Sequence, residues 1–277
     1  MKCEWEKLLA ILPPSMRADV DKLGKDRLQE LRLRLGRPPS LEMGSGRRLL
    51  PESVTVEDVL FVINAASRYS PWASATMAQG YLTAPGGHRI GLCGEVSVRD
   101  GEVTGIRTPT SLCIRVARDF PGIAAQAAAC SGNILIVGAP SCGKTTLLRD
   151  LVRQISEIDK GSIAVMDERG ELFPPLSGFD PGPRTDVLTG CGKVKGLEIV
   201  LRTMGPACIA VDEVTSEEDC RALESALWCG VRIIATAHAS GKQDLMGRNV
   251  YRKLISSGLF DWLIVMNRDK SWKAERM

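Results

Sequence analysis

The sequence predicts two domains: a small α+β domain at residues 1–118 and an α/β domain with a mostly parallel sheet at residues 119–277. After Arg118, five short runs are continuously apolar, which is typical of strands covered on both faces. Helical patterns separate these runs, and such alternation is typical of a parallel sheet with helices on its faces. Before Arg118, amphipathic strands and helices are mixed instead, which predicts the smaller α+β domain.

Three patterns define the elements of the first domain. Glu30–Leu35 alternates leucine with charged residues, which predicts a half-buried strand. Thr55 and Asp58 resemble a capping box before an apolar helical stripe, although Asp replaces the usual Glu or Gln. Asp100-Gly101 separates two valine-rich runs and predicts a hairpin turn.

The second domain begins at a junction within Asp119–Ser131. Its predicted strands are Ile134–Val137, Ile163–Met166, Cys208–Val211, Val231–Ala235 and Trp262–Met266. Helical patterns between them include Lys144–Ile158, Leu197–Met204 and Ser216–Trp228. We found no internal repeat.

Composition excludes several classes of protein. The net charge is +3, and residues 1–118 carry 17 Lys and Arg against 13 Asp and Glu, an excess too dispersed to predict a nucleic-acid surface. Nine cysteines without a Cys-x-x-Cys pair suit a reducing compartment. No apolar stretch reaches the roughly 20 residues that a membrane span requires, and no signal peptide is recognisable. We therefore expect a cytoplasmic protein without a membrane span.

A P-loop motif, Gly-x4-Gly-Lys-Thr, follows the first apolar strand and precedes a helix. Glycines let the backbone curl so that its N–H groups face phosphates, and the following helix N-terminus favours anions. Lys144 is expected to reach the β- and γ-phosphates, and the Thr145 hydroxyl to bind Mg²⁺. The predicted nucleotide-binding residues are Gly138, Ala139, Pro140, Ser141, Cys142, Gly143, Lys144, Thr145 and Thr146.

Two further strand ends carry pairs of carboxylates. Asp212 and Glu213 end an apolar strand as in a Walker B motif, so Asp212 is expected to hold Mg²⁺ and Glu213 to polarise the attacking water. Asp167 and Glu168 end the preceding predicted strand, and ligands gather at the carboxyl ends of parallel strands. His238 ends the fourth strand, from which it can hydrogen-bond the γ-phosphate. We interpret the domain as a RecA-like P-loop ATPase domain that uses ATP and Mg²⁺.

Taken together, these residues resemble the stage III sporulation protein AA family, whose members are related to the ATPases of type II and type IV secretion and of pilus retraction. The resemblance rests on Glu30–Arg37, Gly80–Thr83, Gly86–Gly91, Ser111–Arg118, the P-loop, Asp167–Glu171, Gly182–Leu188, Val211–Glu213 and Thr236–His238. It implies a hexameric ring, with nucleotide between subunits, beside a membrane channel between mother cell and forespore.

The resemblance also assigns roles. Asp167-Glu168 resembles the Asp box of the secretion ATPases in reversed order, which leaves the water-activating carboxylate open between Glu168 and Glu213. Thr236–His238 resembles the His box. No arginine is identified as a finger by the sequence alone, and the candidates are Arg89, Arg107, Arg115, Arg118, Arg184 and Arg202. If the site lies between subunits, we expect Arg115 or Arg118 of the first domain to complete it in a neighbouring subunit.

The leading interpretation is an ATPase that energises assembly of, or transport through, this channel. It lies in the mother cell, without a membrane span of its own, and is recruited by membrane-embedded channel proteins. One alternative is a nucleic-acid-dependent ATPase, which DNA-stimulated turnover would favour. Another is a nucleotide-gated structural ring with little turnover, which the pair Asp212-Glu213 opposes. The sequence identifies neither the transported substrate nor the membrane partner.

Overall fold

The computed structural model describes residues 1–68, 77, 80–174 and 177–277. These residues divide into two compact units, Met1–Asp119 with Pro174–Gly178, and Phe120–Phe173 with Phe179–Met277. The predicted boundary lies between residues 118 and 119, whereas the two units divide between Asp119 and Phe120, and Pro174–Gly178 group with the first unit. No helix in the described ranges is long and apolar enough to cross a bilayer.

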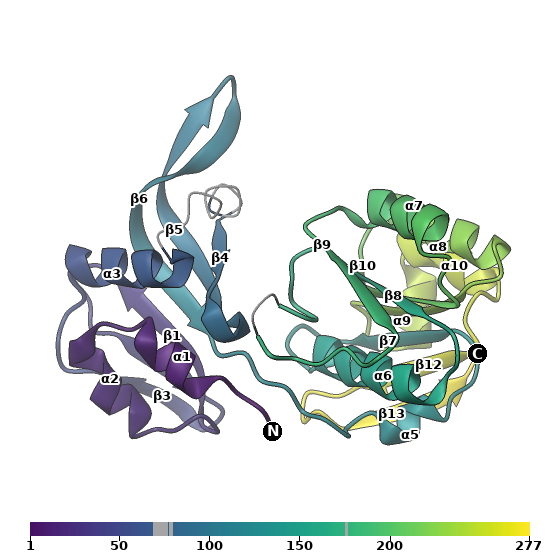
Figure 1. The fold of residues 1–277 in the computed structure, drawn as a ribbon, viewed down its shortest axis with the longest axis horizontal. Coiled ribbons are helices and arrows are strands. Elements are labelled where there is room, and N and C mark those ends of the chain that lie inside the picture. Colours follow the sequence, from purple (N-terminus) through teal and green to yellow (C-terminus); the bar gives the residue numbers. More distant parts are fainter. Residues whose placement is uncertain (69–76, 78–79, 175–176) are drawn as a thin grey trace. The chain divides into compact units, whose positions relative to one another are not determined.

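The first unit is built on a six-stranded sheet with the order β3-β2-β1-β6-β5-β4, in which all neighbours run antiparallel. Its strands are β1 Leu28–Arg34, β2 Ser40–Met43, β3 Gly46–Leu49, β4 Tyr81–Thr83, β5 Arg89–Arg99 and β6 Glu102–Arg115. Its helices are α1 Trp5–Ala10, α2 Pro14–Asp21, α3 Val56–Ser67 and the 3₁₀ turn η2 Pro85–Gly87. Helices α1, α2 and α3 lie beside the sheet (Figure 1), and buried apolar residues of the helices and the sheet form one core.

Local chemistry explains these elements. In β1, Leu31 and Leu33 are buried while Arg34 is exposed, which confirms the predicted half-buried strand. Thr55 accepts a hydrogen bond from the N–H of Asp58, and the Asp58 carboxylate accepts one from the N–H of Thr55, so the capping box at α3 is confirmed. Asp100 and Gly101 both have positive φ, as a tight hairpin turn requires, and join β5 to β6.

The second unit contains a seven-stranded sheet with the order β13-β12-β7-β11-β10-β8-β9, parallel except for β13. Its strands are β7 Ile134–Gly138, β8 Ile163–Asp167, β9 Thr185–Thr189, β10 Cys208–Val214, β11 Arg232–Ala237, β12 Trp262–Met266 and β13 Trp272–Arg276. All five predicted strands are confirmed. The sequence missed β9 and β13, which lie at the two edges, where polar and charged side chains replace a continuous apolar run.

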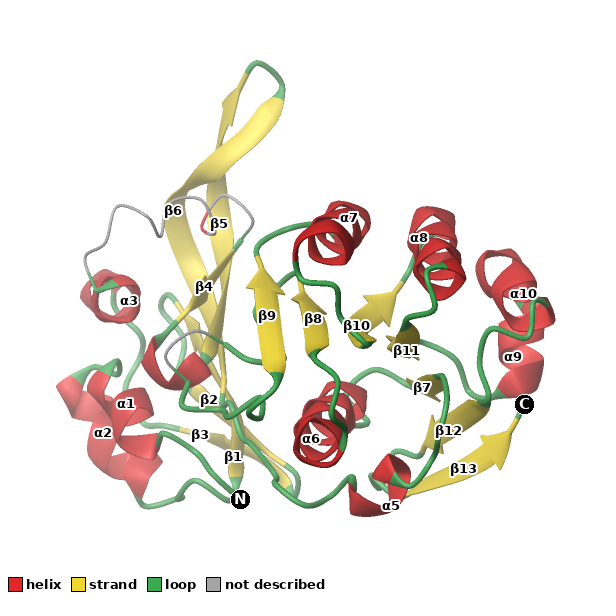
Figure 2. Cartoon of the chain, turned by 45° about the vertical axis from the view of Figure 1, so that its right-hand side comes forward, coloured by secondary structure: helices red, strands yellow, loops and turns green. Residues whose placement is uncertain are grey.

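Helices lie on both faces of this sheet: α5 and α6 on one, and α7, α8, α9 and α10 on the other (Figure 2). They are α5 Ala125–Ala128, α6 Lys144–Ile158, α7 Lys193–Thr203, α8 Glu217–Trp228, α9 Lys242–Gly247 and α10 Asn249–Ser256. Strands β7, β8, β10 and β11 are parallel, so their carboxyl ends meet at one edge of the sheet. This edge receives the loops that carry the motifs.

A buried carboxylate ties the start of the second unit to α6. Asp150 is fully buried and accepts hydrogen bonds from the N–H groups of Gly122, at 3.0 Å, and Ala124, at 2.7 Å. Its Oδ1 also lies 2.8 Å from Nη1 of Arg153, whose Nε donates to the carbonyl of Asp180. The carboxylate therefore satisfies two backbone donors and one buried cation.

We predict that Asp150→Ala lowers the free energy of unfolding by about 3–5 kcal/mol, because it breaks a buried ion pair with Arg153 and removes the acceptor of two backbone N–H groups. Urea denaturation measures this loss. The control is Glu198→Ala, which removes an exposed partner of Lys195 and should change stability by no more than about 0.5 kcal/mol. Equal midpoints for the two variants would contradict the role of Asp150.

Candidate active site

The loop between β7 and α6 takes a form that glycine permits. Gly143 has φ of 104° and Ser141 has φ of 62°, both in the left-handed region. A Cβ at Gly138 would lie 2.5 Å from Sγ of Cys142 and 2.9 Å from the carbonyl oxygen of Met266, closer than real Cβ atoms approach. Both motif glycines are therefore required by the backbone, which curls directly into the N-terminus of α6.

Lys144, the first residue of α6, is buried and points back over this loop. Its Nζ donates to the carbonyl oxygens of Gly138 and Ala139, each at 3.0 Å, and lies 3.0 Å from Nδ1 of His238. Burial lowers the pKa of the Lys144 ammonium, and nearby thiol and carboxylate groups oppose this. The cation is held above the loop where a phosphate would bind.

The contact with Lys144 fixes the tautomer of His238. An ammonium can only donate, so Nδ1 must accept, and a neutral imidazole then carries its proton on Nε2. Nε2 lies 3.0 Å from Oε1 of Glu213 and donates to it. A neutral imidazole thus connects Lys144 to Glu213.

Thr236, two residues before His238, ties β11 to the carboxylate pair on β10. Its fully buried hydroxyl donates to Oδ1 of Asp212 at 2.7 Å and accepts from the N–H of Glu213 at 2.8 Å. The other Asp212 oxygen, Oδ2, accepts from the Thr145 hydroxyl at 2.9 Å. Burial raises the pKa of the Asp212 carboxyl, against the effect of the two hydroxyl donors.

Strand β10 is irregular at this point. Val211 pairs with Ala235 and Val214 with Ala237, so Asp212 and Glu213 together lie opposite the single residue Thr236. Such a bulge bends the strand and changes the direction of its side chains. Glu213 also has φ of 53°, an unfavourable backbone conformation for a residue with a Cβ, and such conformations cluster at active sites.

The carboxylates at the end of β8 have different surroundings. Asp167 is buried and accepts from the N–H groups of Glu171, Leu172 and Phe173 at 2.7–3.0 Å. Burial raises the pKa of this carboxyl, and the backbone donors oppose the rise. Glu168 instead forms an ion pair with Lys193, whose Nζ lies 2.6 Å from Oε2. The predicted catalytic residue Asp167 therefore holds the following loop together.

These strand ends share a cleft of ≈ 110 Å³. Its lining residues are Asp167, Glu168, Arg169, Glu171, Lys193, Asp212, Glu213 and Thr215. Five carboxyl groups thus face two basic groups, and Nη1 of Arg169 lies 3.9 Å from Oε2 of Glu213. The carboxylate of Glu213, whose direction the bulge in β10 changes, lines this cleft.

Comparison with known proteins places the chain in a family. The sequence profile described as sporulation stage III, protein AA, matches residues 4–274. The chain belongs to this family. It is 35% identical to stage III sporulation protein AA of Bacillus subtilis (strain 168) over 280 residues, which cover 95% of this chain and 91% of that protein.

Two solved structures, an ATPase and a pilus retraction motor, have a similar fold. The ATPase DotB of Legionella pneumophila matches 96% of this sporulation family member and 80% of its own chain, with a TM-score of 0.56 at 18% identity. The pilus retraction motor PilT, solved with bound ADP, matches 90% of this chain and 76% of its own, with a TM-score of 0.61 at 15% identity. At these identities the likeness shows the shared mixed α/β fold alone.

In the first unit of this stage III AA family member, the two predicted arginines differ in availability. Arg118 donates from Nε to the carbonyl of Lys25 at 2.9 Å and from Nη2 to the carbonyl of Leu28. Its side chain therefore stabilises the first unit, to which it belongs. Arg115 ends β6 with a side chain that is 65% exposed, and its Nε lies 3.5 Å from Glu30. Arg115 is thus the better placed of the two to reach another molecule.

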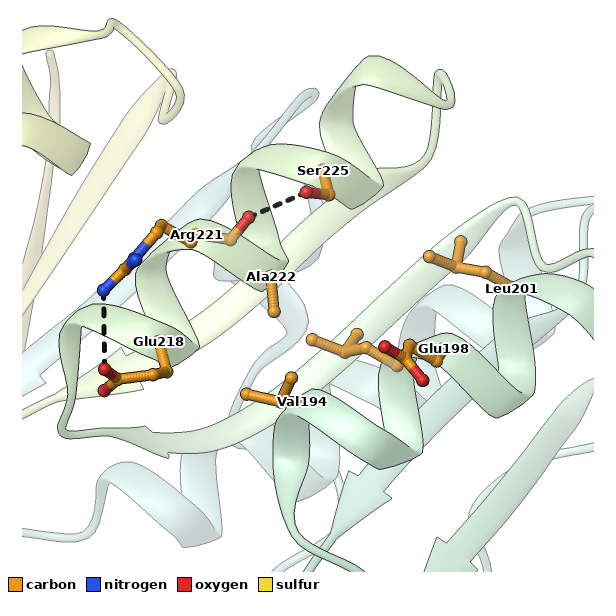
Figure 3. Close-up of a pocket in the computed structure, with 8 residues that line it drawn as sticks. Val194, Glu198, Leu201, Glu218, Arg221, Ala222 and Ser225 are labelled. Carbon is orange, nitrogen blue, oxygen red and sulfur yellow. Dashed lines mark hydrogen bonds and ion pairs between the residues drawn. The ribbon is translucent and has the colours of Figure 1, made fainter.

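A larger groove of ≈ 330 Å³ lies between α7 and α8, and its character is different (Figure 3). Val194 and Ala222 give it apolar walls. Arg221 pairs with Glu218 at 3.4 Å, and Ser225 donates to the carbonyl of Arg221. Glu198, the polar lining residue from α7, pairs with Lys195 of the same helix, so these polar side chains are engaged within their own helices.

The structure brings the P-loop, Asp212, Glu213 and His238 into one hydrogen-bonded set, while their catalytic roles remain predictions. Sequence reasoning missed Lys193, Arg169 and the bridging position of Thr236. One feature of the sequence could have indicated Lys193. It is a basic residue directly after Gly192 at the start of a helix, a position where acidic residues are favoured.

We predict that Thr236→Val destabilises the protein, because the carboxylate of Asp212 and the N–H of Glu213 both lose a partner. Each unsatisfied buried group costs about 1–3 kcal/mol. Thr236→Ser keeps the hydroxyl and should retain most of the stability. Urea midpoints that are equal for the two variants would show that the bridge contributes nothing.

Proposed function

We propose that this chain is a Mg²⁺-dependent ATPase. One linked set of contacts supports the proposal: Lys144 meets His238 and His238 meets Glu213, while Thr145 meets Asp212. These groups come from the ends of β10 and β11 and from the start of α6. They supply a phosphate-binding cation, oxygen ligands for a hard metal ion and a carboxylate base.

The loop after β7 and the side chain of Lys144 bind the phosphates of the nucleotide. Backbone N–H groups of such a loop, with the N-terminus of α6, favour the phosphates. When phosphate enters, the ammonium of Lys144 exchanges its carbonyl partners on Gly138 and Ala139 for phosphate oxygens. Because His238 accepts from the same ammonium, this exchange also changes the contacts of His238.

Thr145 and Asp212 fit Mg²⁺. Their side-chain oxygens lie 2.9 Å apart, and Mg²⁺ is commonly held by one or two protein oxygens together with substrate phosphates. Mg²⁺ there would neutralise charge on the β- and γ-phosphate oxygens. Thr236 orients the Asp212 carboxylate from its other oxygen.

Hydrolysis requires a base for the attacking water. The water oxygen forms a bond to the γ-phosphorus, the bond from that phosphorus to the ADP oxygen breaks, and Glu213 accepts the water proton. Glu213 is the carboxylate that the bulge and the neutral imidazole position. Glu168, by contrast, is engaged by an ammonium at 2.6 Å.

Because the chain belongs to the sporulation family, we extend the proposal to its location and role in the cell. We place the ATPase in the mother cell, at the membrane through channel proteins, where it energises assembly of, or transport through, a channel to the forespore. DotB and PilT, which share the fold, are named as an ATPase and a retraction motor. A homo-oligomer, expected to be a hexamer, would place nucleotide between copies.

We predict that Lys144→Ala abolishes ATP binding or turnover, and that Glu213→Gln binds ATP but loses roughly 10²–10⁴-fold in rate, because an amide is a poor base. Phosphate release and binding of a fluorescent ATP analogue measure these effects. Glu198→Gln, an exposed carboxylate of α7, is the control. A Glu213→Gln variant at the wild-type rate, with an inactive Glu168→Gln, would reverse the assignment. Absence of phosphate release from the wild-type protein with its partners would refute the proposed ATPase.

We further predict that Arg115 acts on the nucleotide of a neighbouring copy. Arginines that act in this way contribute roughly 10³–10⁵-fold in rate. Mixing inactive Lys144→Ala with inactive Arg115→Ala should therefore restore part of the activity, whereas Arg99→Ala, at the exposed β5–β6 turn, should leave it intact. Full activity in a monomer, unchanged by dilution, would exclude action between copies.

A further inference from the structure

Lys193 occupies an unusual position for a basic residue. It is the first residue of α7, and its side chain is only 11% exposed. Its Nζ lies 2.6 Å from Oε2 of Glu168, in the cleft that also contains Glu213. Removing an ammonium from water is unfavourable unless an ion pair compensates for it.

The helix itself disfavours this cation. The N-terminus of a helix carries the positive end of its dipole and favours acidic groups. The first turn of α7, all of whose residues are described, contains no acidic side chain, and Gly192 provides no side-chain cap. Helices α3 and α8 instead begin with a capping box and acidic residues. A residue that violates such a local preference is expected where function, rather than folding, selects it.

The charged groups that line the cleft indicate the role of Lys193. Five carboxyl groups and two basic groups line the cleft, and the two candidate bases have different partners. Glu168 is held through Oε2 by the buried ammonium of Lys193 at 2.6 Å. Glu213 accepts from the neutral imidazole of His238 through Oε1, and its Oε2 lies 3.9 Å from the largely exposed Arg169. A buried cation therefore holds Glu168, whereas the cation paired with Glu213 is exposed and more distant.

We propose that Lys193 is a positioning residue for ATP hydrolysis: its ammonium holds Glu168 in an ion pair and so leaves Glu213 to accept the proton. The proposal rests on the ATPase function proposed above. Lys193 acts through Glu168 and touches neither the P-loop nor the groups assigned to Mg²⁺ among the contacts of the described residues. The expected effect is therefore on the rate, not on nucleotide affinity.

Lys193→Met, Lys193→Arg and a matched control test this. The control is Lys195→Met, because Lys195 lies on the same helix and pairs with Glu198 at 3.1 Å, yet its side chain is 70% exposed. We expect Lys193→Met to lower kcat roughly 10- to 100-fold, as small misplacements at a reacting centre do, with the Kd for a fluorescent ATP analogue within about twofold of wild type. Lys193→Arg, which keeps the charge, should recover most of the rate, and Lys195→Met should match the wild type.

The split between kcat and Kd separates positioning from simple support of the fold. A variant that only loosens the fold would lower its melting temperature, and its rate at temperatures well below melting would stay near that of the wild type. A Lys193→Met variant with the kcat of Lys195→Met would overturn the proposal.

A double-mutant cycle tests whether Lys193 acts through Glu168. The double variant Lys193→Met/Glu168→Gln should be no slower than Lys193→Met, because their shared interaction is already lost. Rate losses that multiply would overturn the proposal. If Lys193→Met melts below the assay temperature, Lys193→Gln replaces it in the cycle. A wild-type protein without ATPase activity would refute the proposed function itself, whereas an active wild type with multiplying losses would refute only the role of Lys193.

Discussion

The arrangement of the site depends on one strand, β11, lying between β7 and β10. Its pairing with β7 sets the distance from the loop before Lys144 to the carboxylates that follow Val211. The hydroxyl of Thr236 then bridges that distance, because it donates to one residue of the bulge and accepts from the next. Without a residue that both donates and accepts at this position, Asp212 and Glu213 would have no common anchor.

The electrostatics of the site follow from which partner each carboxylate has. Asp167 is satisfied by backbone donors, Asp212 by two hydroxyl groups, Glu168 by an ammonium and Glu213 by a neutral imidazole. Four acidic groups at one edge of a sheet are thereby distinguished by their hydrogen bonds rather than by their residue type. This distinction supports the proposed choice of Glu213 over Glu168 as the base, which the reversed order of the Asp box left open.

The sequence predicted the buried part of the second unit well, because a strand covered on both faces must be continuously apolar. It could not reveal β9 or β13, whose polar composition reflects their edge positions. At the site, strand ends carried enough information to select Asp212, Glu213 and His238. The bulge at Glu213, the use of Asp167 within its own loop and the pairing of Lys193 depend on distances between residues far apart in the chain. The sequence pattern also could not distinguish Arg118 from Arg115. The two differ because the Arg118 guanidinium donates to two backbone carbonyl oxygens, those of Lys25 and Leu28.

Strand β7 has both its neighbours late in the chain, with β11 about a hundred residues further on and β12 further still. During synthesis the run Ile134–Val137 therefore emerges long before either strand that covers its edges. Contacts of such long sequence separation form slowly, and an uncovered apolar strand is prone to associate with other chains. The centre of the sheet is accordingly completed only after β11 and β12 have been synthesised, so these two strands set the time at which β7 is covered.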